Sequence, residues 1–401
     1  MKKIGIYGGT FNPPHLGHVQ VADYALKKLG LQRLLIMPSC IPPHKELPKD
    51  SPTPEQRRDM LQLVFAGSPQ ISVSDIELRR GGVSYTIDTV KQVRQEEPEG
   101  ELILLLGTDM FLSFENWYRW QEILQYASLG VLYRGDQEEE PQIAQKKEAL
   151  EKVGATVYLL ENPITPISST QLRRMMTFRC EEQFLPSEIR SYIRENDLFG
   201  CRNDYRNLPM DKLEKTVISL LKPNRVAHVL GCRDTAKDLA QKWGADEQDA
   251  ARAGLLHDVT KALSGPLQLA LCESYGMNLS DFASHNPKTL HALTGSLVAE
   301  RIFGERPEVV SAICSHTTGK ADMNLLEKII YVADYMEPNR NFPGVDEMRR
   351  LAYTDIDEAL RMGLTMTINL LREQGREVSP ESAEALAWLE NKSEKCSFER
   401  M

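Results

Sequence analysis

The chain has 401 residues, more than one hydrophobic core usually spans, so we expect two domains. Its 41% hydrophobic and 26% charged residues match soluble globular proteins and exclude a disordered or fibrous chain. The formal net charge of −9 disfavours a nonspecific nucleic-acid binder, so we expect small-molecule substrates and no nucleic-acid partner.

Two further classes are disfavoured by simple sequence features. Seven cysteines are scattered singly without a C-x-x-C pair, which predicts free thiols and no disulfide framework. No stretch is long and apolar enough for a membrane helix, and the chain opens on a strand pattern without a leader-like segment. We therefore expect a cytoplasmic protein without a membrane partner.

The first half of the chain alternates strand-like and helix-like segments. Short apolar runs predict strands at 3–7, 33–38, 71–78, 102–107, 128–133 and 156–161. Between the first two runs, Val19, Ala22, Leu26 and Leu29 lie on one helix face and lead to Gly30, as in a crossover helix. This alternation predicts an α/β domain built on a parallel sheet.

The second half shows almost no strand signal. Two apolar stripes have helical spacing, and they consist of Ala236, Leu239, Ala240 and Trp243, and of Leu326, Ile329, Ile330 and Ala333. A polar, turn-rich segment without clear periodicity precedes them, near residues 200–210. We therefore expect an α/β domain at 1–202, a linker at 203–209 and an all-α domain at 210–395.

The first predicted strand leads into the loop "GGTFNPPHLGH" at residues 8–18. Glycines after a strand let the backbone turn sharply and approach a ligand, and a helix starting near Leu16 would point free N–H groups at the same place. The dinucleotide fingerprint and the P-loop lysine motif are both absent. His15 and His18, three residues apart, can both reach one phosphate group and stabilise a phosphoryl transition state. The alternative is that both histidines only cap the helix and pack.

Four more blocks follow in order: "IPPHK" at 41–45, "SYTIDT" at 84–89, "LLGTDMFLSFENWYRW" at 105–120 and "ISSTQLRR" at 167–174. With these blocks, the first 200 residues resemble the H-x-G-H nucleotidyltransferase superfamily, and within it the bacterial nicotinate-nucleotide adenylyltransferases. Asn12 is one departure, because many relatives carry Asp there. The resemblance implies a Rossmann-like domain that joins nicotinate mononucleotide to ATP with Mg²⁺, giving nicotinate adenine dinucleotide and pyrophosphate in NAD biosynthesis. Pantetheine-phosphate adenylyltransferases and small cytidylyltransferases are the alternatives.

The resemblance also implies site residues. His15 and His18 would be catalytic, with His18 stabilising charge at the α-phosphate. The implied ATP-binding set is Gly8, Gly9, Thr10, Phe11, His15, His18, Ser168, Ser169, Thr170 and Arg173. The implied set for nicotinate mononucleotide is Lys45, Tyr85, Thr86, Asp109, Trp117 and Arg134. Plain helix capping by the hydroxyl residues and a core role for Trp117 are the alternatives.

The second half carries an ordered set of potential metal ligands: His228, His257, Asp258, His291, His316 and Asp334. His257 and Asp258 are adjacent at the end of an apolar helical segment, so this pair can bind one metal and bridge to a second. Histidine and carboxylate ligands suit iron, manganese, zinc or nickel, and two such metals about 3.5–4 Å apart would activate water and clamp a phosphate. Taken singly, each histidine is more often a core or surface residue.

Five blocks contain these residues: "RVAHVLGC", "AGLLHDVTK", "TLHALTGSLVA", "AICSHTTG" and "IIYVADYMEPNR". They resemble the HD-domain phosphohydrolases, specifically the bacterial symmetrical dinucleoside tetraphosphate hydrolases. The resemblance implies two metals, iron first among them, with Asp258 as a catalytic bridge and Lys261 and Arg340 as phosphate contacts. It implies cleavage of diadenosine tetraphosphate into two ADP molecules.

Together the two resemblances predict a bifunctional enzyme, and the sequence also allows a homo-oligomer. Two alternatives for the second half stay open. It could be another nucleotide phosphohydrolase, acting on deoxynucleoside triphosphates or cyclic nucleotides. It could also be a nucleotide-sensing module without turnover. His285 falls outside the ligand pattern and is expected to be structural.

Overall fold

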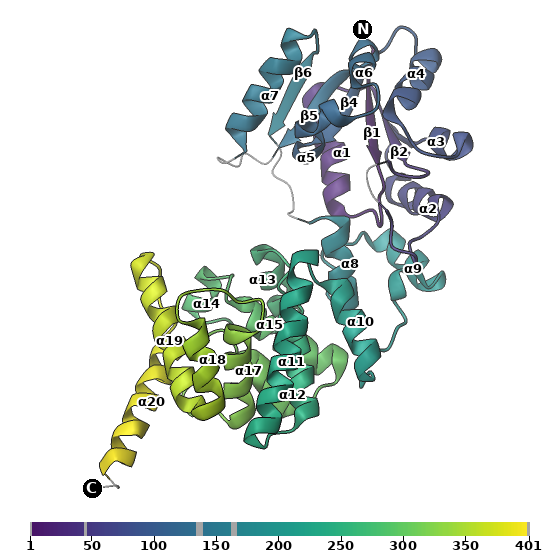
Figure 1. Ribbon diagram of the computed structural model, residues 1–401. Coiled ribbons are helices and arrows are strands. Elements are labelled where there is room, and N and C mark those ends of the chain that lie inside the picture. Colours follow the sequence, from purple (N-terminus) through teal and green to yellow (C-terminus); the bar gives the residue numbers. More distant parts are fainter. Residues whose placement is uncertain (1, 44–45, 134–138, 162–166, 399–401) are drawn as a thin grey trace. The chain divides into compact units, whose positions relative to one another are not determined.

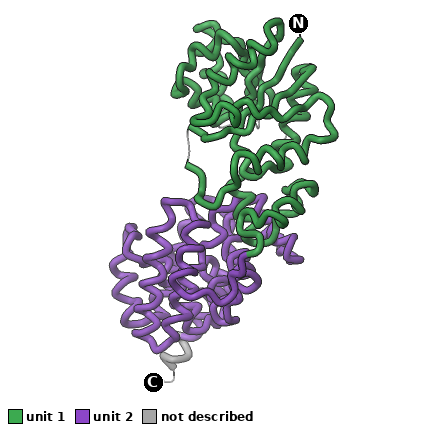
Figure 2. The backbone as a smooth tube through the Cα atoms, turned by 90° about the vertical axis from the view of Figure 1, so that its right-hand side faces the viewer, with its two compact units in different colours: residues 1–202 green, residues 203–401 purple. Residues whose placement is uncertain are grey.

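The computed structural model describes residues 2–43, 46–133, 139–161 and 167–398 (Figure 1). The chain divides into two compact units, residues 1–202 and residues 203–401, coloured green and purple in Figure 2. Among the described helices, none combines the length and the apolar character needed to cross a membrane.

The first unit contains a six-stranded parallel sheet in the order β3-β2-β1-β4-β5-β6. The strands are β1 (Lys3–Gly9), β2 (Arg33–Pro38), β3 (Ile71–Val73), β4 (Glu101–Gly107), β5 (Ser128–Tyr133) and β6 (Val157–Glu161). This is the doubly wound arrangement, and the strand order reverses between β1 and β4. The predicted α/β fold is confirmed.

Helices cover both faces of the sheet (Figure 1). On β4, Leu102, Leu104 and Leu106 pack in one core layer, and Ile103 and Leu105 pack in the other. Because both faces are buried, the strand reads as a continuous apolar run. The first layer is covered by α4 (Thr86–Glu96), α5 (Thr108–Leu112), α6 (Trp120–Tyr126) and α7 (Glu140–Lys152). The second is covered by α1 (Leu16–Leu29) and α2 (Pro54–Phe65).

The third predicted strand is wrong in its second half. The strand ends at Val73, and Ile76–Arg80 form the short helix α3. The alternation of polar and apolar residues at 72–78 imitates a strand, but only Ile76 of the later apolar pair is buried. Gly81 ends α3 with a φ of 70°, a left-handed conformation that favours glycine.

Two helices follow the sheet, and residues on and between them contact earlier elements. These are α8 (Ser169–Thr177) and α9 (Ser187–Glu195). The backbone N–H of Leu16, the first residue of α1, donates to the carbonyl oxygen of Phe184 at 3.0 Å. The Tyr192 hydroxyl on α9 donates to Asp59 on α2 at 3.3 Å. The N-terminus of α1 is therefore held by residues far along the chain.

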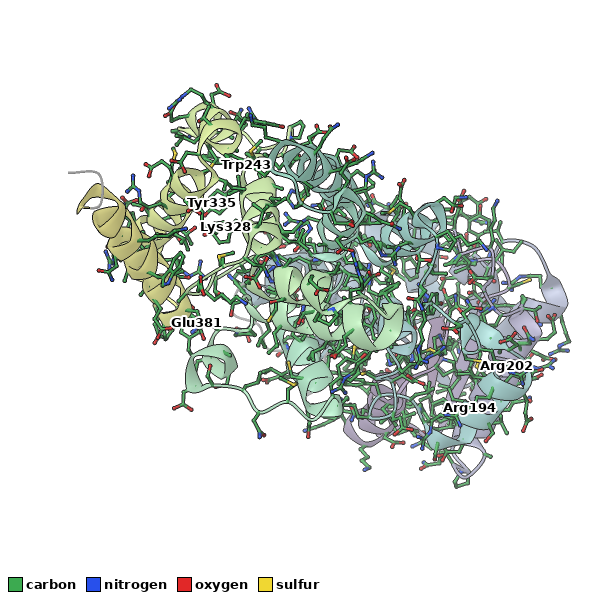
Figure 3. The ribbon with its side chains drawn as sticks, turned by 90° about the horizontal axis from the view of Figure 1, so that it is seen from below. Arg194, Arg202, Trp243, Lys328, Tyr335 and Glu381 are labelled. Atoms are coloured by element: carbon green, nitrogen blue, oxygen red, sulfur yellow. The ribbon has the colours of Figure 1, made fainter. Side chains whose placement is uncertain are left out.

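The second unit is helical, and it contains no strand among its described residues, as predicted. Its helices are α10 (Met210–Leu220), α11 (Val226–Trp243), α12 (Glu247–Leu256), α13 (Gly265–Ser274), α14 (Asp281–His285), α15 (Leu290–Val298), α16 (Pro307–Ser315), α17 (Leu325–Met336), α18 (Val345–Thr354), α19 (Ile356–Glu373) and α20 (Pro380–Phe398). Both predicted apolar stripes pack inward, with Trp243 half-buried at the end of the first. The indole N–H of Trp243, which is labelled in Figure 3, donates to the carbonyl oxygen of Ala352 at 2.8 Å.

The segment 203–209, expected as a linker, lies within the second unit. The Tyr205 ring lies 6.1 Å from the ring of Phe303, and the Asn207 N–H donates to the Phe303 carbonyl oxygen at 2.9 Å. The Arg252 guanidinium donates to the Leu208 carbonyl oxygen at 2.9 Å. These contacts fix the segment to the helices that follow it.

A close approach of α11 and α12 gives a stability prediction. A Cβ at Gly254 would lie 2.9 Å from the Cα of Arg233, so Gly254→Ala forces two helix backbones apart. We expect a loss of about 1–3 kcal/mol, measured as a lower Tm of one transition in calorimetry of the full chain. Gly67→Ala is the control, because a Cβ there meets nothing within 4 Å. An unchanged Tm for Gly254→Ala would contradict this helix packing.

Candidate active sites

The loop after β1 brings two imidazoles together at the start of α1. His15 is the N-cap residue, and its backbone N–H donates to Nδ1 of His18 at 3.1 Å. The two rings stack with their centroids 3.5 Å apart. Because Nδ1 of His18 accepts a hydrogen bond, a neutral His18 carries its proton on Nε2. Burial lowers the pKa of His15 to about 3, so this ring is neutral near pH 7.

The predicted phosphate-binding residues of α8 contact this loop directly. The Ser169 hydroxyl donates to the carbonyl oxygen of Pro13 at 3.0 Å. Arg173 donates through Nη1 to the carbonyl oxygen of Asn12 at 2.6 Å and through Nη2 to Thr170 at 3.2 Å. Ser168 is the N-cap residue of α8. The structure therefore brings the two ends of the predicted ATP-binding set together, beside Gly8 and Gly9 at the carboxyl end of β1.

A buried arginine that was not expected from the sequence lies beneath the same loop. Arg57 on α2 is fully buried and donates to the carbonyl oxygens of Thr10 at 2.7 Å, Ser39 at 2.7 Å and Cys40 at 3.2 Å. Burial lowers the pKa of Arg57, and nearby acidic groups oppose this shift. The guanidinium joins the loops after β1 and β2. A lone arginine in an amphipathic helix usually faces solvent, so the sequence carries no signal for this role.

Phe11 completes the loop from the inside. It is buried in a left-handed conformation with a φ of 50°, and its ring centroid lies 4.9 Å from that of His18. A Cβ at Gly9 would lie 3.0 Å from the Phe11 ring, so the second glycine leaves room for it. The buried Phe11 ring thus packs against the His18 imidazole.

The residues predicted for the pyridine nucleotide lie after β4, in the segment that carries Asp109 and Trp117, and at the start of α4, where Tyr85 and Thr86 lie. Asp109 is exposed in the first turn of α5, directly after β4 and thus beside the switch between β1 and β4. Trp117 is partly buried, and its ring centroid lies 5.4 Å from that of Phe114 in the core. Tyr85 precedes α4, which Thr86 begins.

Tyr118, which was not singled out from the sequence, connects the segment of Trp117 with the start of α4. The exposed Tyr118 ring lies 4.8 Å from that of Tyr85, so the loop before α4 meets the turn that carries Trp117. The aromatic block "ENWYRW" was the available signal for Tyr118. The two basic residues predicted for this side, Lys45 and Arg134, lie outside the described residues.

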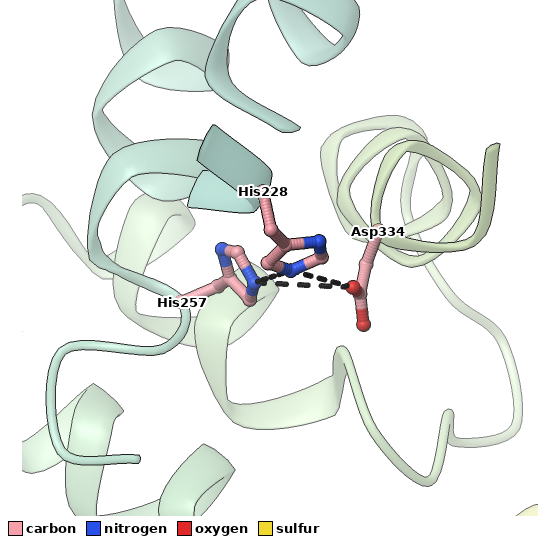
Figure 4. Close-up of side chains that lie close together, drawn as sticks. All are labelled: His228, His257 and Asp334. Atoms are coloured by element: carbon pink, nitrogen blue, oxygen red, sulfur yellow. Dashed lines mark hydrogen bonds and ion pairs between the residues drawn. The ribbon is translucent and has the colours of Figure 1, made fainter. Parts of the chain in front are cut away.

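In the second unit, the predicted ligands form two clusters that share Asp258. The first cluster consists of His228 on α11, His257 directly after α12, Asp334 on α17, and Oδ2 of Asp258 (Figure 4 shows the first three). Nε2 of His228 lies 3.2 Å from Nε2 of His257 and 3.2 Å from Oδ1 of Asp334. Oδ2 of Asp258 lies 3.4 Å from Nε2 of His257.

The second cluster consists of His291 on α15, His316 directly after α16, and Oδ1 of Asp258. His257 links the two clusters, because its ligand atom lies within 4.8 Å of those of Asp258 and His316. The Nε2 atoms of His291 and His316 lie 3.1 Å apart, and Oδ1 of Asp258 lies 3.4 Å from Nε2 of His291. This buried Oδ1 has no hydrogen-bond partner among the described residues. One carboxylate thus faces both clusters, an oxygen to each.

The other nitrogen of each imidazole is already paired. Nδ1 donates to the carbonyl oxygen of Gly254 in His257 at 2.7 Å, of Lys288 in His291 at 2.9 Å, and of Ile313 in His316 at 2.7 Å. In His228, Nδ1 lies 3.2 Å from Oε1 of Glu337. A carbonyl or carboxylate oxygen can only accept, so each Nδ1 carries the proton and the lone pair of a neutral imidazole is on Nε2. The Thr317 hydroxyl lies 3.1 Å from Nε2 of His291 and 3.1 Å from Nε2 of His316.

In each cluster, the Nε2 atoms of two histidines approach each other: His228 with His257, and His291 with His316. Two neutral Nε2 acceptors about 3.1–3.2 Å apart repel unless a cation lies between them. Burial lowers the pKa of His316 to about 4, which disfavours a proton between the rings of the second cluster near pH 7. In the first cluster, burial lowers the pKa of His257, but Cys232 and Asp258 outweigh it and raise this pKa well above its usual range, so a proton or a metal can lie between those rings. The donor set of imidazole nitrogens and carboxylate oxygens therefore fits a divalent metal in each cluster.

Three residues that support the clusters were missed from the sequence. Glu337 is 1% exposed, and its Oε2 accepts from the backbone N–H and the side chain of Asn339, each at 2.8 Å. A Cβ at Gly231 would lie 2.4 Å from that Oε2, so only glycine fits there. Arg225 donates through Nε to Oδ2 of Asp258 at 2.5 Å. All three stand inside quoted motif blocks, but the pattern did not separate them from their neighbours.

The two predicted phosphate contacts lie beside the clusters and reach solvent. The Arg340 guanidinium donates to Oδ1 of Asp334 at 2.5 Å, and the Lys261 ammonium lies 2.7 Å from Nε2 of His291. Their side chains are 34% and 38% exposed. Both cations therefore lie where a ligand entering from solvent would meet them.

Comparisons with known proteins match the two units to different families. Residues 6–175 match the cytidylyltransferase-like family model, and residues 225–339 match the HD domain model. Two curated relatives are named "Probable nicotinate-nucleotide adenylyltransferase". The one from Idiomarina loihiensis is 32% identical over 206 residues, which cover 48% of this chain and 98% of the relative. The one from Pelobacter propionicus is 36% identical over 213 residues, which cover 49% and 98%.

Two solved structures are similar to separate halves of the chain. A "predicted HD superfamily hydrolase involved in NAD metabolism" from Clostridium acetobutylicum is 38% identical and covers 46% of this chain and 98% of its own, with a TM-score of 0.45. The nicotinic acid mononucleotide adenylyltransferase of Plasmodium falciparum, complexed with NaAD, is 19% identical and covers 50% and 98%, with a TM-score of 0.42.

The two clusters predict metal binding that depends on the shared carboxylate. The double variant His257→Ala with Asp258→Ala removes a ligand of the first cluster and the carboxylate of both, so bound metal should fall at least about tenfold in elemental analysis. His285→Ala is the matched control, because His285 is exposed on α14 and should leave the metal content unchanged. Equal metal content in both variants would contradict the assignment of the clusters.

Proposed function

The N-terminal half of this chain belongs to the nicotinate-nucleotide adenylyltransferase family, and we propose that it joins nicotinate mononucleotide to the adenylyl group of ATP. The observation that carries this proposal is the hydrogen bond from the His15 N–H to Nδ1 of His18. It makes Nε2 of His18 a hydrogen-bond donor beside the N-terminus of α1, where an anion is favoured. A donor held in this way suits the charge that develops on an α-phosphate.

The proposed reaction needs no covalent intermediate on the protein. A phosphate oxygen of nicotinate mononucleotide attacks the α-phosphorus of ATP, and the bond from that phosphorus to the bridging oxygen of the β-phosphate breaks. Nicotinate adenine dinucleotide forms, and pyrophosphate leaves with the electron pair. We assign Mg²⁺ to ATP as in other phosphoryl transfers. His15 and His18 hold the transferring group, and catalysis rests on positioning and charge.

The remaining loops bind the ends of the two substrates. Ser168, Ser169 and Thr170 begin α8, and their hydroxyl and N–H groups face the β- and γ-phosphates together with Arg173. Tyr85, Thr86, Asp109 and Trp117 hold the pyridine nucleotide, with the Trp117 ring against nicotinate. The contacts of Ser169 and Arg173 with the loop at Asn12 and Pro13 support this division of roles.

His18→Ala should lower kcat about 10²–10³-fold and change the KM for ATP much less, since the interaction strengthens in the transition state. His18→Gln is the matched variant, because its amide N–H can replace the Nε2 donor, and it should retain more activity than His18→Ala. Steady-state kinetics with ATP and nicotinate mononucleotide measures both. Near-normal turnover by His18→Ala would overturn the proposal for this site.

For the second unit, we propose a phosphohydrolase that holds two divalent metals, iron first among them, and cleaves diadenosine tetraphosphate into two ADP molecules. The two clusters joined by Asp258 and the match to the HD domain model support this proposal. When bound, a pair of divalent ions supplies the charge that activates water and neutralises phosphate oxygens. The ligands are His228, His257, Asp258, His291, His316 and Asp334.

The cations around the clusters favour a polyphosphate substrate. Arg225, Lys261 and Arg340 have side chains that are 28%, 38% and 34% exposed, so they are open to a ligand. In the proposed reaction, water attacks one of the two central phosphorus atoms, and the bond to the oxygen between them breaks. Each product then keeps two phosphates. A different nucleotide phosphohydrolase and a sensing module without turnover remain the competing proposals for this unit.

A substrate panel separates these proposals. The full chain with Mn²⁺ or Fe²⁺ should release ADP from diadenosine tetraphosphate, because the three cations match a chain of four phosphates, and Asp258→Ala should abolish this release. His18→Ala should leave it unchanged. Chromatography of the products measures the result. Faster hydrolysis of a deoxynucleoside triphosphate or a cyclic nucleotide would favour another phosphohydrolase, and bound metal without hydrolysis would favour the sensing module.

A further inference from the structure

A buried carboxylate in the first unit, that of Glu77, lies outside the residue sets assigned to the two substrates. Glu77 is on α3 and is 6% exposed. The Thr89 hydroxyl on α4 donates to Oε1 of Glu77 at 2.6 Å. Burial raises the pKa of Glu77, and hydrogen bonds from the hydroxyls of Thr89 and Ser84 oppose this rise. One carboxylate thus binds two hydroxyl groups.

These two hydroxyl groups flank the start of α4, where residues assigned to the pyridine nucleotide lie. Ser84 directly precedes Tyr85, the N-cap residue of α4, and Thr89 lies in the first turn of this helix. Both Ser84 and Thr89 are buried. Glu77 therefore holds the loop before α4 and the first turn of α4 at the same time, with Tyr85 and Thr86 between the two contacts.

Ser84 also connects this loop to the segment after β2. Its Oγ accepts from the Cys40 N–H at 2.8 Å, and its own N–H donates to the Ile41 carbonyl oxygen at 2.9 Å. The Cys40 carbonyl oxygen accepts from Arg57, which also donates to the carbonyl oxygen of Thr10. Hydrogen bonds therefore run from the loop after β1, through Arg57 and Cys40, to the loop before α4.

From these contacts we propose that Glu77 and Ser84 are positioning residues for nicotinate mononucleotide, a role that rests on the adenylyltransferase function proposed above. Glu77 fixes the backbone on both sides of Tyr85 and Thr86. Ser84 fixes the same backbone against the segment after β2. Neither side chain needs to touch a substrate, because both act through the loop that they hold.

This role affects one substrate more than the other. The loop after β1, which is assigned to ATP, is held by Arg57 at Thr10 and by Arg173 at Asn12. Neither of these hydrogen bonds involves Glu77 or its two hydroxyl partners. Loss of the Glu77 contacts should therefore weaken the binding of nicotinate mononucleotide, and a loss of ground-state binding raises KM with little change in kcat.

Ser84→Ala tests the connection, because it removes the hydroxyl group that binds both Glu77 and the Cys40 N–H, and it adds no bulk. We expect the KM for nicotinate mononucleotide to rise about tenfold, because a buried donor and a buried acceptor lose their partner. The KM for ATP and kcat should change less than about threefold. Steady-state kinetics of the full chain, with each substrate varied in turn, measures all three values.

Ser72→Ala is the matched control. Its hydroxyl lies on β3 in the same unit and accepts from Nε of Arg33 at 3.2 Å, away from the start of α4. Both KM values should stay unchanged in this variant. In Ser84→Ala, an unchanged KM for ATP also reports that the unit is folded.

Thr89 gives a second pair of variants. Thr89→Val keeps the shape of the side chain but leaves Glu77 without one donor, so the KM for nicotinate mononucleotide should rise. Thr89→Ser keeps the hydroxyl group and should have a KM near that of the natural chain. A role limited to folding would change both KM values together or neither.

Two results would overturn the positioning role alone. One is a natural KM for nicotinate mononucleotide in Ser84→Ala, or equal values in Thr89→Val and Thr89→Ser. The other is an equal rise in the KM values of both substrates. If the natural chain does not join nicotinate mononucleotide to ATP, the proposed adenylyltransferase function itself fails.

Discussion

One constraint recurs at both sites: the protein binds one ring nitrogen of His18 and one of each histidine in the metal clusters, and this decides what the other nitrogen can bind. Nδ1 of His18 accepts from the His15 N–H, so its Nε2 carries a proton and suits a phosphate oxygen. In His257, His291 and His316, Nδ1 donates to a carbonyl oxygen, so Nε2 has a lone pair and suits a metal. The two units use the same side chain in opposite tautomers.

The chain makes these choices with local backbone geometry. His15 precedes the first turn of α1, and the His18 ring three residues later turns back to its N–H. His257, His291 and His316 each donate to the carbonyl oxygen of the residue three positions earlier. The start of α1 thus orients His18 toward an anion, and one hydrogen bond within a helical turn orients Nε2 of each of the other three histidines toward a metal. Longer-range contacts, such as those of Arg57 and Glu337, then hold these turns in place.

Much of the fold and of the two sites follows from the sequence, because apolar periodicity and short motifs are local properties. All six predicted strands exist, although 74–78 imitates a strand and Ile76 instead begins a helix. The six residues proposed as metal ligands lie close together in the structure. Arg57 and Glu337 could not be found, since their roles come from contacts with segments that are distant in the chain, two loops for Arg57 and helix α11 for Glu337. The contact of Lys261 with His291 is likewise visible only in three dimensions.

The tautomers of the histidines test this account most directly. Long-range proton–nitrogen NMR of the full chain, labelled with ¹⁵N at histidine and loaded with Zn²⁺, distinguishes a proton on Nδ1 from one on Nε2. The account predicts a proton on Nε2 of His18 and on Nδ1 of the four histidines in the metal clusters. A proton on Nδ1 of His18, or metal bound through Nδ1 in the clusters, would contradict it.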